Sequence, residues 1–172
     1  MHVFLTGERG IGKSQAIRTA VSLIGRVPYG FLTRFGTEGD PTAALYMVSP
    51  SRQEPMGEAE RIAVRRDGRI TLLPDRFDSL AADLLREASC HPEGIILMDE
   101  CGHLEAGLTH FHAEILRCLD GDIPVLGALR LDQPWHALIR NHPGVKVFRV
   151  TAENRDSLPA LIAETILNKE AL

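Results

Sequence analysis

Hydrophobic positions at the start of the chain form a short continuous run and then a helical stripe. Residues 3–5, Val-Phe-Leu, have the length and composition of a buried strand. After a glycine-rich stretch, apolar residues recur every three or four positions, and Gly25 provides a stop signal. The predicted helix presents on one face Ala16, Ile17, Ala20, Val21 and Ile24. The pattern therefore predicts a strand, a glycine loop and a helix, in that order.

The second half of the chain alternates between the same two patterns. The stretch from Phe77 to Ala88 carries apolar residues at helical spacing and predicts an amphipathic helix. Continuous apolar runs predict strands covered on both faces, and the stretches that follow these runs predict helices. The strands are expected at residues 95–98, 125–129 and 145–150, and the helices at 108–119, 135–140 and 154–168. This alternation predicts a three-layer α/β fold, with a mostly parallel sheet and helices on both faces.

Residues 36–76 are the least regular part of the chain, because glycines and prolines interrupt them repeatedly. They follow a predicted strand at 29–33 and contain short strand-like runs at 44–48, 62–64 and 70–73. Asp67-Gly68 is a hairpin signal. We expect a small antiparallel excursion here, and not a separate domain.

The length of 172 residues indicates a single domain spanning residues 1–172. The three cysteines are an odd number without a C-x-x-C pair, which indicates reduced thiols. The N-terminus leaves no room for a signal peptide, and no apolar run approaches 18 residues. We therefore expect a soluble cytoplasmic protein without a membrane partner. The net charge of −4 argues against a general nucleic-acid binder.

The glycine loop between the first strand and helix carries the strongest chemical signal. A loop of the form G-x-x-x-x-G-K-S binds phosphate through inward-pointing N–H groups and the positive end of the following helix. It reads Gly7-Glu8-Arg9-Gly10-Ile11-Gly12-Lys13-Ser14. We expect all eight residues to bind nucleotide. Lys13 would stabilise the β- and γ-phosphates catalytically, and Ser14 would ligate Mg²⁺.

Two carboxylates follow the apolar run at 95–98. Asp99, at the predicted strand tip, can hold Mg²⁺ through its water shell, and Glu100 can orient and deprotonate an attacking water. Asp99 through Gly102 also spells D-x-x-G, but the guanine-reading N-K-x-D is absent, so guanine specificity is unsupported.

These residues resemble the broad-specificity P-loop nucleoside-triphosphatase family, which includes the animal cancer-related nucleoside-triphosphatase. The resemblance extends over nearly the whole chain. The matching segments are 6–14, 30–33, 77–80, 97–102 with 104–105, and 151–156. It implies Mg²⁺-dependent hydrolysis of several nucleoside triphosphates to diphosphate and phosphate. The chain departs from the family pattern at Arg34, Phe35 and His103, which indicates a divergent member.

Several further residues are secondary candidates. Arg130 follows the predicted strand at 125–129, so it could stabilise charge on the transferring phosphoryl group, or it could be a surface arginine. Asn154 could contact the base or ribose, although capping of the last helix is the better account. His110 and His112 do not share a helix face, so we interpret them as surface histidines. Trp135 is interpreted as a packing residue.

Two alternative functions remain open from the sequence. A small-molecule or nucleotide kinase would use the same loop with an acceptor in place of water, and residues 52–76 are the candidate acceptor lid. A nucleotide-gated interaction protein would hydrolyse slowly to reset a contact. The preferred base, the cellular role and the oligomeric state do not follow from the sequence.

Overall fold

The computed structural model describes residues 1–36, 44–52, 57–66, 69–102, 107–130 and 133–168. Its strands are β1 (His2–Thr6), β2 (Pro28–Phe35), β3 (Leu45–Val48), β4 (Arg61–Arg66), β5 (Arg69–Leu72), β6 (Ile95–Cys101), β7 (Val125–Leu129) and β8 (Val145–Arg149). Its helices are α1 (Lys13–Ile24), α2 (Pro74–Ala88), α3 (Thr109–Leu119), the 3₁₀ turn η1 (Pro134–His136), α4 (Ala137–Arg140) and α5 (Leu158–Leu167).

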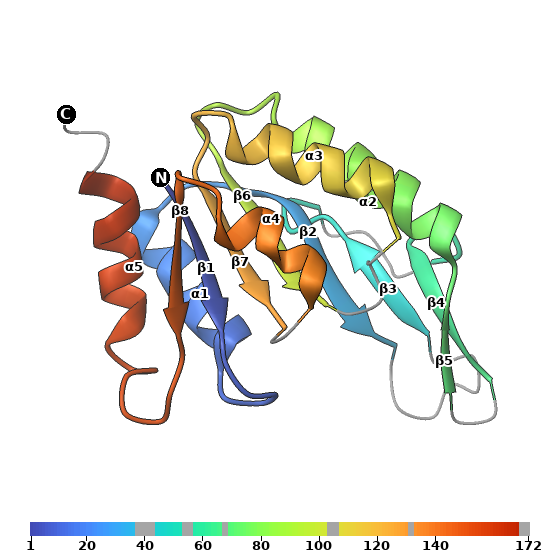
Figure 1. Cartoon of the computed structure of the whole chain (residues 1–172), viewed down its shortest axis with the longest axis horizontal. Helices are drawn as coiled ribbons and strands as arrows, with labels where there is room; N and C mark the ends of the chain where they lie inside the picture. The colour runs from blue at the N-terminus through green and yellow to red at the C-terminus, as the bar shows by residue number, and fades with distance from the viewer. Residues whose placement is uncertain (37–43, 53–56, 67–68, 103–106, 131–132, 169–172) are drawn as a thin grey trace.

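The described strands form one sheet in the order β5-β4-β3-β2-β6-β7-β1-β8. β2, β6, β7, β1 and β8 pair in parallel, whereas β3, β4 and β5 extend the sheet in antiparallel fashion beyond β2. Figure 1 shows β1, β2, β7 and β8 pointing toward the same lower edge, where the loop from β1 to α1 lies. The predicted parallel sheet and its antiparallel excursion are both confirmed.

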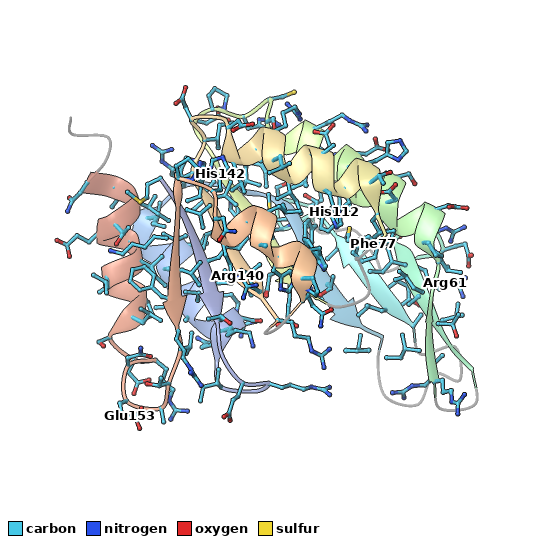
Figure 2. The ribbon with its side chains drawn as sticks, viewed as in Figure 1. Arg61, Phe77, His112, Arg140, His142 and Glu153 are labelled. Carbon is cyan, nitrogen blue, oxygen red and sulfur yellow. The ribbon has the colours of Figure 1, made fainter. Side chains whose placement is uncertain are left out.

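Helices cover both faces of the sheet because side chains alternate along each buried strand. Phe4 of β1 packs in a cluster with residues of α2, α3 and α4, whereas Val3 and Leu5 pack with α1 and α5. Phe77 of α2 and His112 of α3 lie on the sheet-facing side of their helices (Figure 2). The three-layer α/β prediction is confirmed.

Trp135 has the packing role expected of it. Its Nε1 donates a hydrogen bond to the carbonyl of Gly102 at 3.2 Å, and its ring stacks on His112 with centroids 4.6 Å apart. His112 is therefore half-buried under η1, and its interpretation as a surface histidine was wrong. His110 is exposed, as expected. Within the described ranges, no helix is both long and apolar enough to cross a membrane.

The boundary of the last helix differs from the prediction. α5 begins at Leu158 and not at 154, and Ser157 occupies the cap position without a capping side-chain bond. Asn154 instead accepts a hydrogen bond from the Thr151 N–H at 2.8 Å and donates one to the Arg149 carbonyl at 2.9 Å. These bonds close a turn ahead of the helix, and Pro159 suits its first turn. The capping role predicted for Asn154 was wrong. The hairpin signal Asp67-Gly68 lies outside the described residues.

Asp78 of α2 joins two helices. Its carboxylate accepts hydrogen bonds from the N–H of Phe111 at 2.7 Å and of His110 at 3.3 Å, and it contacts the His110 ring at 2.7 Å. Leu108, at the cap position of α3, cannot satisfy those donors with its own side chain. Partial burial opposes ionisation, but the hydrogen bonds from Phe111 and His110 outweigh it and lower the pKa of Asp78.

We expect Asp78→Ala to reduce the free energy of unfolding by about 1 kcal/mol, as for loss of a helix cap. A lowered carboxyl pKa stabilises the fold above the unfolded value of about 3.8 and ceases to do so below the folded value. Thermal unfolding of variant and parent should therefore differ at pH 7 and converge under strong acid. Asp83→Ala, at an exposed position of the same helix, is the control. An unchanged midpoint at pH 7 would contradict the capping role.

Candidate active site

The loop between β1 and α1 has the backbone geometry of a phosphate-binding loop. Gly7, Gly10 and Gly12 have φ angles of 146°, 78° and 111°, which favour glycine. A Cβ on Gly7 would lie 2.8 Å from the Val150 carbonyl, so the loop is also packed tightly against the end of β8. α1 starts directly after Gly12, and its N-terminus faces the loop.

Lys13 is buried beneath this loop, with 7% of the residue exposed. Its Nζ donates to the carbonyls of Gly7 and Glu8, each at 3.1 Å. It also lies 3.6 Å from Oε2 of Glu100. The cation is thus held between the loop and the strand that carries the two carboxylates.

Ser14 and Asp99 meet at the base of the loop. The Ser14 Oγ donates to Oδ1 of Asp99 at 3.2 Å, and Thr33 donates to the Asp99 backbone carbonyl at 3.3 Å. Burial raises the pKa of Asp99; the hydrogen bond from Ser14 opposes the shift and the neighbouring Glu100 adds to it. A hydroxyl and a carboxylate are hard oxygen donors of the kind that Mg²⁺ prefers alongside phosphate and water, so these residues fit that metal.

The two carboxylates are part of β6 itself, which continues to Cys101, and do not follow its end. The pairing of β6 with β7 shifts register between Met98 and Cys101, around these two residues. The N–H of Arg130 then donates to the Cys101 carbonyl at 2.9 Å, which fixes the residue after β7 beside them. The register shift between β6 and β7 therefore coincides with the two candidate active-site carboxylates, Asp99 and Glu100.

A pocket of about 760 Å³ brings most of the predicted site residues together. Its lining includes Gly7, Glu8, Arg9, Gly10, Gly12, Lys13, Ser14, Glu100 and Arg130. Asp99 lies behind Ser14. A smaller pocket of about 370 Å³ is lined by Ile11, by residues of α1, by Arg155 and Asp156 ahead of α5, and by Pro159 in its first turn. Asn154 is in the lining of neither pocket.

The larger pocket also contains residues that sequence reasoning missed as site residues. Gln15 and Arg18 of α1 line it, as do Thr33 and Phe35 of β2, Leu45 of β3 and Ile70 of β5. Arg18 follows Ser14 by one helical turn, a spacing that could have indicated it. No local sequence pattern indicates that the residues of β2, β3 and β5 line a pocket, because the order of the strands in the sheet brings them there. His103 lies outside the described residues.

A parallel α/β sheet with a glycine loop, a buried lysine and paired carboxylates at one edge defines a P-loop nucleotide-binding protein. Residues 2–163 match the model of a protein family described as NTPase, and the chain belongs to that family. The resemblance stated from sequence is thereby confirmed.

Several proteins similar to this chain carry related names. The chain is 25% identical to the nucleoside-triphosphatase THEP1 of Natranaerobius thermophilus, over 96% of both chains. It is 30% identical to the human cancer-related nucleoside-triphosphatase, over 91% of this chain and 92% of the relative. The crystal structure of THEP1 from Aquifex aeolicus superposes with a TM-score of 0.76 at 22% identity, covering 97% of this chain and 99% of the other. That structure supports the fold.

Proposed function

We propose that the protein hydrolyses nucleoside triphosphates to nucleoside diphosphates and phosphate, with Mg²⁺ as cofactor. The observation that carries this proposal is the placement of Glu100 in the same pocket as the phosphate-binding loop, 3.6 Å from Lys13. A carboxylate next to the cation that holds the terminal phosphate is placed to act on a water at that phosphate. Family membership and the names of the relatives support the same activity.

The predicted catalytic, phosphate-binding and metal-binding residues then have distinct roles. The loop N–H groups and Lys13 bind the β- and γ-phosphates, and Ser14 and Asp99 would hold the metal. Mg²⁺, when bound, offsets phosphate charge. Glu100 accepts a proton from water as the water oxygen bonds to the γ-phosphorus and the bond to the leaving diphosphate breaks. Arg130, directly after the neighbouring parallel strand β7, stabilises charge on the transferring group.

The two pockets suggest how the nucleotide lies. Both pockets include in their linings Gly10, Gly12 and Gln15. The phosphate-binding loop therefore lies between the larger, charged pocket and the smaller one. With the γ-phosphate beside Glu100, the ribose and base extend toward Arg155 and Pro159 in the smaller pocket. The chain carries no guanine-reading N-K-x-D motif, and we therefore propose that several bases are accepted.

Phosphate release from purified protein, with ATP, GTP, CTP and UTP each in the presence of Mg²⁺, tests this proposal. We expect hydrolysis of all four and loss of activity when the metal is chelated. Retention of full activity in excess chelator would contradict the metal requirement. Absence of phosphate release from every triphosphate would overturn the proposed function.

Asp99→Asn is expected to raise the Mg²⁺ concentration needed for half-maximal turnover by about 10–100-fold, since a metal-holding carboxylate is lost. The same change should raise the melting temperature of the metal-free protein at pH 7. Folding raises the pKa of the Asp99 carboxyl in the parent protein. The ionised carboxylate therefore destabilises the fold at pH values above the folded pKa. Asparagine can still accept the hydrogen bond from Ser14.

Thermal unfolding against pH checks the second part of this prediction. The gain should vanish toward pH 3.8, the ordinary aspartate value, because the parent carboxyl is then protonated. Asp83→Asn at an exposed site serves as the control for both measurements. A metal-free variant less stable than the parent at pH 7 would show that the Asp99 charge is compensated in the fold.

A further inference from the structure

The far end of the larger pocket differs in chemistry from the phosphate-binding end. Three apolar side chains line it: Phe35 at the end of β2, and Leu45 of β3 and Ile70 of β5 in the antiparallel extension. Phe35 and Leu45 are register partners, so two of them lie directly side by side. Phe35 is 56% exposed and Ile70 39% exposed, so both present apolar surface at the lining of the pocket. We call these three residues the apolar wall.

Strand order places the apolar wall beyond the terminal phosphate. From β1 the sheet runs through β7 and β6 to β2, so β2 lies three strand spacings, or about 14 Å, from the strand that leads into the loop. Glu100 on β6 lies between them. If the γ-phosphate sits beside Glu100, as the proposed function requires, the apolar wall lies on its far side. The smaller pocket, which would hold the base, lies at the other end of the loop.

The charges in the pocket are concentrated at the phosphate end. Arg9, Lys13 and Arg18 come from the loop and α1, and Glu100 and Arg130 from the neighbouring strand ends. These groups match a triphosphate and its metal. The apolar wall itself offers no charge and no hydrogen-bonding side chain, so its ligand must be neutral and apolar where it touches the wall. Small-molecule sites combine such an apolar surface with a few polar groups, and Thr33 supplies one next to Phe35.

We propose that the apolar wall binds the neutral, apolar body of a second small molecule while the nucleotide is bound, with that molecule beside the γ-phosphate. Its placement relative to the phosphate rests on the proposed function, but the binding surface does not. All three wall residues belong to described strands. A ligand here would lie next to the γ-phosphate, the group that hydrolysis removes. Hydrolysis could then depend on a compound other than the nucleotide.

The probe for this site is N-phenyl-1-naphthylamine, a neutral aromatic compound whose fluorescence rises in apolar surroundings. We expect the parent to bind it saturably at one site per chain. Phe35→Ser and Ile70→Ser should each bind about tenfold more weakly, the effect of losing one large apolar contact. Leu161→Ser is the matched control, since Leu161 is 44% exposed on α5, away from both pockets, and it should bind as the parent does. Circular dichroism and melting temperatures establish that each variant is folded.

Nucleotide competition separates a second ligand from the nucleotide itself. Adenylyl imidodiphosphate with Mg²⁺, at saturation, should change the dissociation constant of the probe by less than about twofold. Displacement by this analogue but not by inorganic triphosphate would mean that the base occupies the apolar wall, and displacement by both would mean that the phosphates reach it; either result overturns the proposal. Absence of saturable binding, or equal binding by parent and wall variants, also overturns it. Phosphate release is measured separately, so an inactive parent with wall-dependent binding would overturn hydrolysis and retain the site.

Discussion

Glu100→Gln is expected to lower the rate of phosphate release by about 10²–10⁴-fold, the range for loss of a general base. Glutamine keeps the shape of the side chain but cannot accept the proton of the attacking water. Nucleotide affinity should be retained or increased. In the nucleotide-free protein Glu100 lies 3.6 Å from the Lys13 ammonium and competes with phosphate for it. Removing the negative charge therefore removes the competitor.

Single-turnover phosphate release and equilibrium nucleotide titration measure the two effects separately. Glu153→Gln is a suitable control, because Glu153 is an exposed carboxylate on the loop from β8 to α5, at the same edge of the sheet (Figure 2). It should behave as the parent in both assays. A Glu100→Gln protein that turns over at the parental rate would exclude Glu100 as the base. Weakened binding with an unchanged rate would assign it to substrate positioning.

Lys13→Ala is expected to weaken nucleotide binding by at least about 100-fold, because removal of a buried charged partner costs about 2–5 kcal/mol. Turnover should fall at least as far, since the same cation stabilises the transition state. Lys13 is almost fully buried and donates to the Gly7 and Glu8 carbonyls, so the substitution also removes two bonds that shape the loop.

A less disruptive companion variant separates charge from loop shape. Lys13→Arg keeps a cation but cannot reproduce the compact geometry of an ammonium in this space. If nucleotide binding needs the compact charge of an ammonium at this position, Lys13→Arg should recover less than a tenth of the affinity that Lys13→Ala loses. The melting temperature of each metal-free variant shows how far the loop itself is altered. Parental affinity in Lys13→Ala would mean that backbone N–H groups alone hold the phosphates.

Features encoded in short stretches could be predicted from the sequence. The loop at residues 7–14 and the apolar runs at 95–98 and 125–129 depend on neighbours a few positions apart, and the structure has the expected strands and helix there. The start of α5 was misplaced because Asn154 can either cap a helix or close a turn with Thr151. The choice depends on Pro159 and on packing against α1, where local preference is weak.

Contacts between distant segments could not be predicted in the same way. Lys13 and Glu100 meet because β6 and β1 flank β7, an order that no local pattern specifies. The apolar wall is assembled from β2, β3 and β5, and Phe35 in isolation is an unremarkable apolar residue. The sequence supported the nucleotide-binding half of the pocket, where a motif exists. For the half built by strand order it marked only Phe35 as a departure from the family pattern and residues 52–76 as a candidate acceptor lid, without bringing them together.

The two outer strands of the sheet, β5 and β8, have a consequence for behaviour at high concentration. Each presents one row of backbone groups that no described strand pairs, and such edges recruit other chains. Arg69 begins β5, and β8 carries Lys146 and Arg149, all exposed. The Lys146 ammonium also lies 4.9 Å from the centre of the Phe148 ring and shields it. Like charges at both margins oppose edge-to-edge association, so the solubility of this protein should depend on a few basic residues of its two outer strands.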